Sequence, residues 1–218
     1  MNECERVFWL IEWFKISASR EESFRVMTTL FFAPTEHTAG GMTLRSYRPG
    51  DGAALQAATV SSYEHLRPWM PWATAEYTVE QAEANCRRFA ASYLLSQDFT
   101  IGIWVGGELA GGSGFHLRAG PLEWRNAEIG MWIRGSYAGQ GLGTRALAAM
   151  LSWGFQEWGW ERLVWHCDTR NIASARVAEK NGLKLEGTLR ADRFGTDGQR
   201  RDTHIYAILR GEWRTGRG

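Results

Sequence analysis

The sequence predicts an α/β protein in which helices flank a mixed, mostly antiparallel sheet. Three observations support this fold class. Strand-like and helix-like segments alternate from about residue 44 onward, a glycine-rich stretch runs directly into a helical pattern, and 44% of the 218 residues are hydrophobic. That apolar content is enough for one sizeable core. We therefore expect a single domain over residues 42–218, preceded by an extension over residues 1–41.

The extension has a different composition from the rest of the chain. Apolar residues over positions 7–14 fall at helical spacing and predict a short amphipathic helix, and "APTEHTAGG" after it is typical of a linker. Met27 and Met42 are both plausible starts of the folded part. We therefore expect a chain that begins at Met42 to keep its turnover.

The first half of the domain begins with a strand over residues 44–47. Asp51 is expected to cap a helix that continues to about Tyr63. The segment "LRPWMPW", with its two prolines, predicts a rigid loop. A second helix follows, in which Thr78 and Gln81 have the spacing of a capping box.

Three strands follow as a meander. The first two cover residues 99–105 and 109–118, and Gly106-Gly107 supplies the two-residue turn between them. The third covers residues 123–133. Together with the elements before it, this meander predicts a largely antiparallel first half of the sheet.

The second half starts at the glycine-rich stretch, which leads into a helix reaching about Trp158. "RLVWHCD" predicts a buried strand, and "NIASARVAEKNG" predicts a helix that ends at Asn181-Gly182. "LKLEGTLRADRF" and the segment after "FGTDGQ" predict the last two strands. The expected order of elements is β-α-α-β-β-β-α-β-α-β-β.

Charge and cysteine content exclude several classes of protein. The net charge of +1 gives no long-range field that would attract nucleic acid or an anionic membrane. The three cysteines lie far apart, which favours free thiols in a reducing compartment and gives no zinc-finger spacing. The apolar stretch at residues 7–14 is far shorter than the ~20 residues of a membrane-spanning helix. We therefore expect a cytoplasmic protein without a metal.

The stretch "AGQGLGTRALAAM" places three glycines at the entrance of a helix. Glycine lets a ligand approach the backbone, and the free N–H groups at a helix N-terminus bind anions such as phosphate. Thr144 adds a hydroxyl. The spacing differs from a Walker A loop, which needs a lysine, and from a dinucleotide-binding fingerprint. A tight strand-to-helix turn without a ligand remains the structural alternative.

This loop resembles the acyl-CoA loop of the GNAT N-acetyltransferases, whose pattern is Gln/Arg-x-x-Gly-x-Gly/Ala. The two glycines match, and Ala138 stands where Gln or Arg is usual. "LRPWMPW", "NAEIGMWI" and "NIASARVAEKNGL" are similar to segments of the RimJ/RimL branch, which acetylates protein N-termini and other amines. The resemblance covers about residues 44–213.

The resemblance implies a GNAT-like acyl-CoA N-acyltransferase fold and acetyl-CoA as the co-substrate. It implies that the strand over residues 128–133 splays away from "RLVWHCD" and that the pantetheine arm lies between them. The implied cofactor-binding residues are Met131, Trp132, Ile133, Gly139, Gln140, Gly141, Leu142, Gly143, Thr144 and Asn171.

Two residues are candidates for the chemical step. Glu128 is the candidate base for the attacking amine. Its structural alternative is a glutamate at a strand end that partners an arginine such as Arg125. The resemblance implies that Ser174 is the proton donor to the leaving thiolate. Its hydroxyl is expected to act mainly by orientation and hydrogen bonding. Asn171, three residues earlier, is also a good helix cap.

Cysteine, histidine and tryptophan residues are further candidates for the site. Cys167 lies in a predicted strand and is expected to be a buried, inert thiol, which favours direct attack over an acyl-cysteine route. His116 and His166 are expected to be structural. Trp69 and Trp72 are expected to line the acceptor site, with a cap on one end of the core as the alternative.

The preferred function is transfer of an acetyl group from acetyl-CoA to a protein α-amine, for instance on a ribosomal protein. The alternatives are a small amine acceptor, such as an aminoglycoside or polyamine, and an acyl-CoA-binding sensor without catalysis. No nucleic-acid or membrane partner is expected, and the protein is expected to be a monomer or a homodimer.

Overall fold

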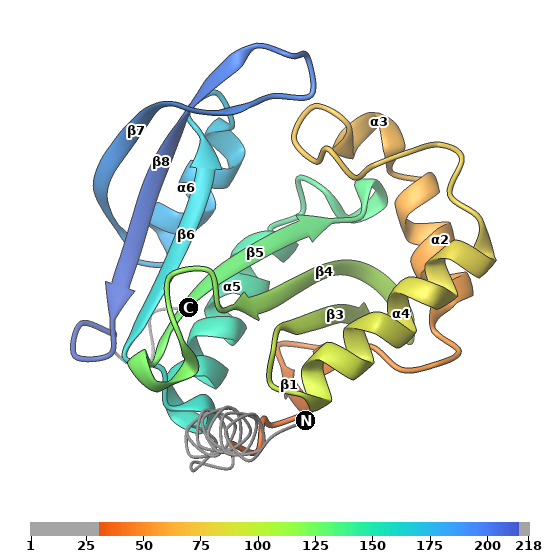
Figure 1. Ribbon diagram of the computed structural model, residues 1–218, viewed down its shortest axis with the longest axis horizontal. Helices are drawn as coiled ribbons and strands as arrows, with labels where there is room; N and C mark the ends of the chain where they lie inside the picture. Colours follow the sequence, from red (N-terminus) through yellow and green to blue (C-terminus); the bar gives the residue numbers. More distant parts are fainter. Residues whose placement is uncertain (1–30, 214–218) are drawn as a thin grey trace, which may run out of the picture. The chain divides into compact units, whose positions relative to one another are not determined.

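The computed structural model describes residues 31–213, and an eight-stranded sheet runs through them (Figure 1). Cys4 and the helix predicted over residues 7–14 lie outside this range. The strands are β1 (Glu36–Ala39), β2 (Met42–Ser46), β3 (Phe99–Val105), β4 (Glu108–His116), β5 (Asn126–Ile133), β6 (Arg162–Asp168), β7 (Lys184–Phe194) and β8 (Arg200–Leu209). Their spatial order is β1-β2-β3-β4-β5-β6-β8-β7. The β5–β6 pair is parallel and the other neighbours are antiparallel, so the predicted mixed sheet is confirmed.

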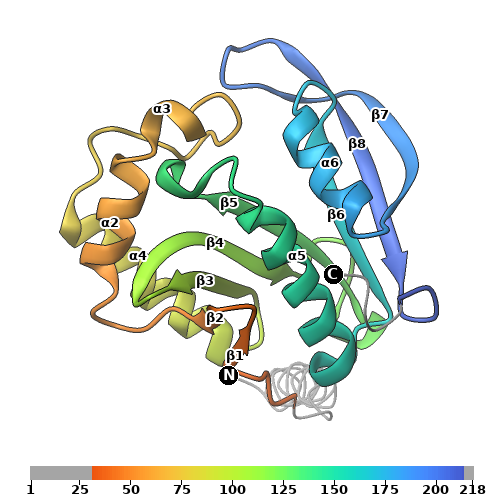
Figure 2. The ribbon, with the colours of Figure 1, turned by 180° about the vertical axis from the view of Figure 1, so that it is seen from behind.

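Helices cover both faces of this sheet. They are α2 (Gly52–Val60), α3 (Tyr63–Leu66), α4 (Val79–Leu94), α5 (Leu142–Trp153) and α6 (Ile172–Lys180). Figures 1 and 2 show α2 and α4 on one face and α5 and α6 on the other. No helix among residues 31–213 is both long enough and apolar enough to cross a membrane.

The segment predicted as a linker contains a strand instead. β1 pairs antiparallel with β2 from Glu36↔Arg45 to Ala39↔Met42. The ring of His37 stacks on Trp153, with centroids 5.5 Å apart. The linker prediction was wrong because β1 has only four residues and alternates between exposed and half-buried positions, which leaves little apolar signal.

Local sequence signals determine several of the element ends. The capping box of α4 is formed by Thr78 and Gln81 as predicted. Gly106 and Gly107 both adopt positive φ in the turn between β3 and β4. Asp51 precedes α2 but its side chain does not cap it. The Asp51 carboxylate binds Arg45 instead, with contacts of 2.8 and 2.9 Å.

The strand predicted over residues 123–133 begins only at Asn126, because Leu122–Trp124 form a 3₁₀ turn. Two predicted helices also have different bounds in the structure. The first helix ends at Val60, because the hydroxyls of Ser61 and Ser62 both donate to the carbonyl of Ala58 and so replace the next helical turn. α3 then forms a separate turn. At the other end of the fold, α5 ends at Trp153 and continues as a π-helical turn, Gly154–Trp158.

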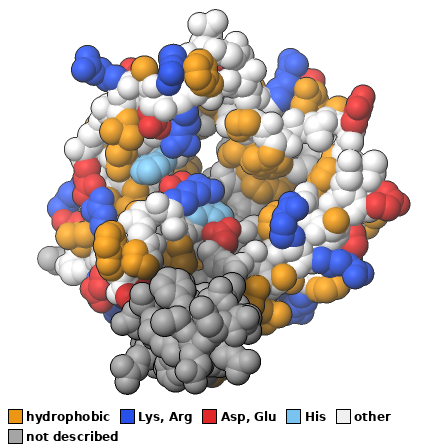
Figure 3. Space-filling view, viewed as in Figure 1, with side chains coloured by type: hydrophobic (Ala, Val, Ile, Leu, Met, Phe, Trp, Pro, Cys, Tyr) orange, Lys and Arg blue, Asp and Glu red, His pale blue; other side chains and the backbone are white. Residues whose placement is uncertain are grey.

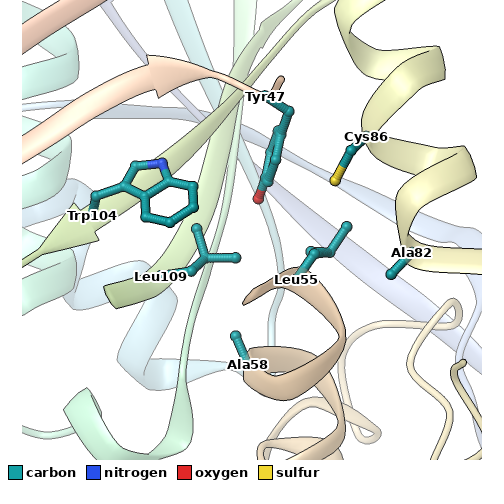
Figure 4. Close-up of a cluster of buried hydrophobic side chains, with 7 residues drawn as sticks. All are labelled: Tyr47, Leu55, Ala58, Ala82, Cys86, Trp104 and Leu109. Atoms are coloured by element: carbon teal, nitrogen blue, oxygen red, sulfur yellow. The ribbon is translucent and has the colours of Figure 1, made fainter. Parts of the chain in front are cut away.

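The core has one part on each face of the sheet. Figure 4 shows the cluster beneath α2 and α4, made by Tyr47, Leu55, Ala58, Ala82, Cys86, Trp104 and Leu109. On the other side, Trp158 packs against Phe99 and Phe115, with ring centroids 4.8 Å apart in both pairs. Such aromatic pairs add ~0.5–1.5 kcal/mol each beyond their buried area. These two clusters fix the strands that position the site.

Candidate active site

The site is built where β5 and β6 separate. The two strands pair in parallel from Asn126↔Arg162 to Glu128↔Val164, and no further pairs follow among the described residues. Both strands nevertheless continue, β5 to Ile133 and β6 to Asp168. Figure 1 shows their ends diverging. The backbone groups that would have joined the strands therefore face the gap between the diverging strand ends instead of a partner strand.

Glu128 lies at the point of divergence. The residue is 8% exposed, and its Oε1 is 2.5 Å from Nη1 of Arg118. Its Oε2 is 3.3 Å from Nδ1 of His166. The arginine partner is therefore Arg118 rather than Arg125. Arg118 is therefore the hydrogen-bond partner that orients the carboxylate, and His166 lies close to its other oxygen without a hydrogen bond.

The residues after Glu128 alternate between the two faces of β5. The ring of Trp132 packs on the cluster beneath α2 and α4 and meets Trp72 edge-on at 5.9 Å. Ile133 points to the opposite face, where it lies beside Gly143 of α5. Met131 shares that face by the alternation of the strand. A cofactor on the α5 side would therefore meet the side chains of Met131 and Ile133 but only the backbone of Trp132.

The glycine-rich stretch forms an uncapped helix N-terminus. Gly139 and Gly141 both have φ of +73°, a conformation that favours glycine. Gly141 occupies the N-cap position of α5, and no side chain bonds to the first turn. A Cβ on Gly139 would meet nothing within 4 Å. The N–H groups of this first turn are thus open to an anion, and the dipole of a twelve-residue helix favours one.

The other residues of this loop have different positions. Leu142 is 3% exposed, so its side chain belongs to the core and only its N–H faces the loop. The amide of Gln140 donates to the carbonyl of Ser136 at 2.8 Å. Thr144 is half-buried, and its carbonyl accepts from Asn181 of α6 at 3.2 Å. Gly143 has an ordinary helical φ and room for a Cβ.

Ser174 lies on α6 and faces β6. Its hydroxyl oxygen accepts from the indole N–H of Trp165 at 3.0 Å, and the hydroxyl also hydrogen-bonds the thiol of Cys167. Asn171 caps the helix, because its side-chain oxygen accepts from the N–H of Ser174 at 3.1 Å. The cap predicted for Asn171 is therefore confirmed.

Cys167 is buried on β6, as predicted. Burial raises the pKa of its thiol, and the hydrogen bond with Ser174 offsets only part of that rise. The thiolate needed for an acyl-cysteine route is therefore disfavoured.

The two tryptophans of "LRPWMPW" lie in the loop between α3 and α4. Trp72 is 50% exposed and rests on Trp132. Trp69 is half-buried, and the guanidinium of Arg201 lies 5.9 Å from its ring centroid. Trp72 therefore lies near the end of β5, and Trp69 lies near the β7–β8 hairpin.

Sequence reasoning missed the partners of the histidines. Nδ1 of His116 is 2.7 Å from Oδ1 of Asp98. Burial alone would raise the pKa of Asp98, but the hydrogen bond and charge of His116 outweigh it and lower that pKa below its ordinary value. His116 also lies opposite Glu128 in the β4–β5 register. The strand register is the signal that would have revealed this cluster, and it cannot be read from a single strand.

The face of the sheet on which α2 and α4 lie is hollowed (Figures 1 and 3). Figure 3 shows the hollow between the side of β6 and β8 and the side of α2 and α3. Histidine, basic and acidic side chains gather on the first side, and hydrophobic side chains gather on the second. The site thus combines an anion-binding helix end, a gap between two strands and a paired carboxylate at the start of that gap.

Comparison with protein families finds a match to the acetyltransferase (GNAT) domain over residues 42–184. The chain is 27% identical over 176 residues to YdaF of Bacillus subtilis (strain 168), named as a candidate ribosomal N-acetyltransferase; the match covers 79% of this chain and 93% of YdaF. It is 38% identical over 102 residues to the ribosomal-protein-serine acetyltransferase of Escherichia coli (strain K12), covering 47% of this chain and 55% of that protein.

A solved structure shares the fold. RimJ of Mycobacterium smegmatis, in complex with CoA-disulfide, superposes with a TM-score of 0.73 at 26% identity. The superposition covers 81% of this chain and 85% of RimJ.

Proposed function

Because this chain belongs to the GNAT acetyltransferase family, in its RimJ/RimL-like branch, we propose that it transfers an acetyl group from acetyl-CoA to the N-terminal α-amine of a protein. The observation that carries the proposal is the gap between β5 and β6, with an uncapped helix N-terminus on one side and Glu128 at its start. Relatives named for ribosomal-protein acetylation support the class of acceptor.

On the cofactor side, the first turn of α5 would hold the pyrophosphate through its N–H groups. Gly139 and Gly141 keep side chains out of the path of the phosphates, and Gly143 contributes its backbone N–H. Backbone groups of β5 from Met131 to Ile133 would pair with the pantetheine arm, and Asn171 would contribute its side-chain amide. This arrangement directs the thioester towards the start of the gap.

On the acceptor side, the amine nitrogen attacks the thioester carbonyl directly. Glu128 takes the proton that the amine loses, directly or through a water. The C–S bond then breaks. The Ser174 hydroxyl donates a hydrogen bond to the leaving thiolate, which takes its proton from water. The Trp165 indole fixes the position of that hydroxyl.

An α-amine is the preferred acceptor because it loses its proton more easily than a lysine side chain does. A free α-amine has a pKa near 7.7–8.0, so roughly one in ten is neutral at pH 7, whereas a lysine is neutral only about once in 2,500. A cationic small amine would favour an acidic pocket. The carboxylates of Glu128 and Asp98 are instead matched with Arg118 and His116.

The test is a CoA-release assay with acetyl-CoA against a panel of peptides with free N-termini, aminoglycosides and polyamines. We expect release with peptides, with the acetyl group found on the α-nitrogen by mass spectrometry. Release with aminoglycosides or polyamines alone would change the acceptor class. Binding of acetyl-CoA without release from any amine would indicate a sensor.

A further inference from the structure

A buried arginine connects three separate parts of the chain. Arg201 of β8 has a side chain only 8% exposed. Its Nη1 is 3.0 Å from Oδ2 of Asp168, the last residue of β6. Its Nη2 donates to the carbonyl of Pro68 at 3.0 Å. One guanidinium therefore joins the end of β6, the last strand and the α3–α4 loop.

The same contacts continue to the end of β5. Trp69, next to Pro68, lies by the Arg201 guanidinium, and Trp72 of the same loop packs on Trp132 of β5. The path from Asp168 through Arg201 and the loop to Trp132 thus spans the two strand ends that diverge. Both ribbon views show the β7–β8 hairpin and the α3–α4 loop side by side (Figures 1 and 2).

The hairpin is shaped to hold the guanidinium in this position. A Cβ on Gly195 would lie 1.6 Å from Nε of Arg201, so the guanidinium packs directly against the Gly195 backbone. Thr196, the next residue, donates its hydroxyl to the carbonyl of Pro68 at 3.3 Å. Gly195 does not have a positive φ, so a Cβ at this position would act by displacing the Arg201 guanidinium rather than by straining the backbone.

We propose that Arg201 is a positioning residue for the acceptor: it fixes the α3–α4 loop across the diverging ends of β5 and β6 and thereby sets the entrance through which the amine reaches the thioester. This rests on the function proposed above. A planar guanidinium presents two N–H groups in fixed directions to Asp168 and Pro68, which the single ammonium of a lysine cannot do.

The proposal predicts a specific kinetic effect. The cofactor-binding loop, Gly139–Thr144, belongs to the N-terminus of α5 on the other face of the sheet, so loosening the α3–α4 loop should leave acetyl-CoA binding intact. The reacting groups Glu128 and Ser174 also stay in place. The acceptor should therefore bind more weakly while the chemical step keeps its rate.

The experiment uses two variants and two matched controls. Arg201→Lys keeps the charge but loses one contact, and Gly195→Ala displaces the guanidinium without changing any charge. Gly187→Ala is the control for the second, because a Cβ at Gly187 meets nothing within 4 Å. Arg200→Lys is the control for the first, because Arg200 is exposed on the same strand.

The kinetic probe is a heptapeptide with a free N-terminal serine, or whichever amine of the panel turns over. We expect KM for this acceptor to rise about tenfold in Arg201→Lys and Gly195→Ala, with kcat and KM for acetyl-CoA within about threefold. Both controls should match the parent protein. An unchanged acceptor KM in both variants, or an equal fall in kcat with acceptor KM constant, would overturn the proposal.

A second measurement does not depend on activity. Chymotrypsin should cleave after Trp69 or Trp72 faster in both variants, whereas cleavage after Trp124, which is 62% exposed elsewhere on the fold, should not change. If no amine is acetylated by the parent protein, the proposed function fails and this cleavage still tests the role of Arg201. Unchanged cleavage in the α3–α4 loop would show that Arg201 does not hold it.

Discussion

Glu128, at the start of the gap between β5 and β6, is already oriented by its neighbours before any substrate binds. Glu128 has Arg118 on one oxygen and His166 near the other, so little conformational entropy remains to be lost at this carboxylate when the amine binds. Arg118 is 59% exposed and can return to water when an ammonium group takes its place. The geometry thus suits a role for Glu128 as a base, because the incoming amine can displace Arg118 from the carboxylate.

Replacing Glu128 with glutamine tests this role. The variant keeps the shape of the side chain and removes its basicity, so kcat at neutral pH should fall by about 10²-fold while acetyl-CoA affinity stays within a few-fold. The loss should shrink as pH rises, because the amine then deprotonates unaided. Steady-state kinetics from pH 6 to pH 9 measure this.

Arg118→Gln is the matched control, since it removes the partner and keeps the carboxylate. It should retain most of the turnover. Full turnover of Glu128→Gln across the pH range would assign Glu128 a structural role, and catalysis would then depend on positioning and on the neutral fraction of the amine.

Ser174→Ala should have a smaller effect. We expect kcat to fall about tenfold, because water can replace a hydroxyl donor in part. The indole N–H of Trp165 also loses its acceptor, which costs about 1–3 kcal/mol of stability if it stays buried. Ser174→Thr keeps both functions of the hydroxyl and should restore kcat. Equal losses in both variants, measured at a temperature where both are folded, would contradict a role for the hydroxyl.

Sequence alone identified these residues one by one but not their partners. Asn171 and Thr78 were predictable caps, because a cap depends on residues three positions away. The pairs Glu128–Arg118 and His116–Asp98 depend on which strands are neighbours and in what register. Neither property is encoded in a local pattern.

At the scale of elements, the N-terminus of α5 is the most distinctive feature. Gly141 is its N-cap in a left-handed conformation, and the first turn has no side-chain cap. A natural helix that leaves its first turn open usually binds an anion or water there.

Gly141→Val should abolish the rise in melting temperature that acetyl-CoA gives the parent protein. A β-branched residue at a φ of +73° is strained, and its side chain occupies the path of the phosphates. The variant itself should be less stable by about 1–3 kcal/mol. Thermal unfolding with and without acetyl-CoA measures both effects.

Gly143→Ala is the control for this change. Its Cβ would meet Ile133 and Val177 at ordinary contact distances of 3.6 and 3.7 Å, so the helix should accept it and keep the acetyl-CoA shift. An undiminished shift in folded Gly141→Val would mean that the cofactor binds elsewhere.

Most elements could be predicted because their signals are local. The bounds of β3 and β6 agree with the prediction, since each strand has a run of at least three buried residues with mostly β-branched or aromatic side chains. β1 was missed because a short edge strand shows no strong alternation. The π-helical turn was predicted as plain helix, because the apolar spacing of Gly154–Trp158 continues that of α5 and only packing distinguishes the two.

At the scale of the whole molecule, the extension predicted over residues 1–41 divides into two parts. The chain from Ala33 onward clusters as one unit that includes β1. The hydroxyl of Tyr93 donates to the carbonyl of Pro34, which attaches this segment to α4. All of the proposed site residues lie after Met42.

A chain that begins at Met42 should therefore keep near-normal kcat but lose stability. Removing β1 and its contacts should cost about 2–4 kcal/mol, which corresponds to a melting temperature lower by roughly 5–15 °C for a protein of this size. A chain that begins at Ala33 should regain the parent melting temperature. Loss of activity in the chain beginning at Ala33, at a temperature where it is folded, would place a functional part within residues 1–32.

The sheet order itself could not be read from the sequence. Placing β8 between β6 and β7 requires knowledge of which strands cross over, and each strand alone is compatible with several neighbours. The family resemblance implied the splay of β5 from β6, and residue patterns alone did not.

That splay has a consequence for solvent exchange. In a continuous sheet the central strands have the slowest-exchanging amides, because both edges are hydrogen-bonded. Here alternate amides between Ile129 and Ile133 face a side where β6 has moved away, so in the free protein deuterium should enter the middle of the sheet rather than only its borders. A cofactor that takes the place of the missing strand would close this entry, and protection would then appear on β5 and β6 together. The ligand would thereby become a structural part of the sheet, and its binding free energy would add directly to the cost of opening the centre of the fold.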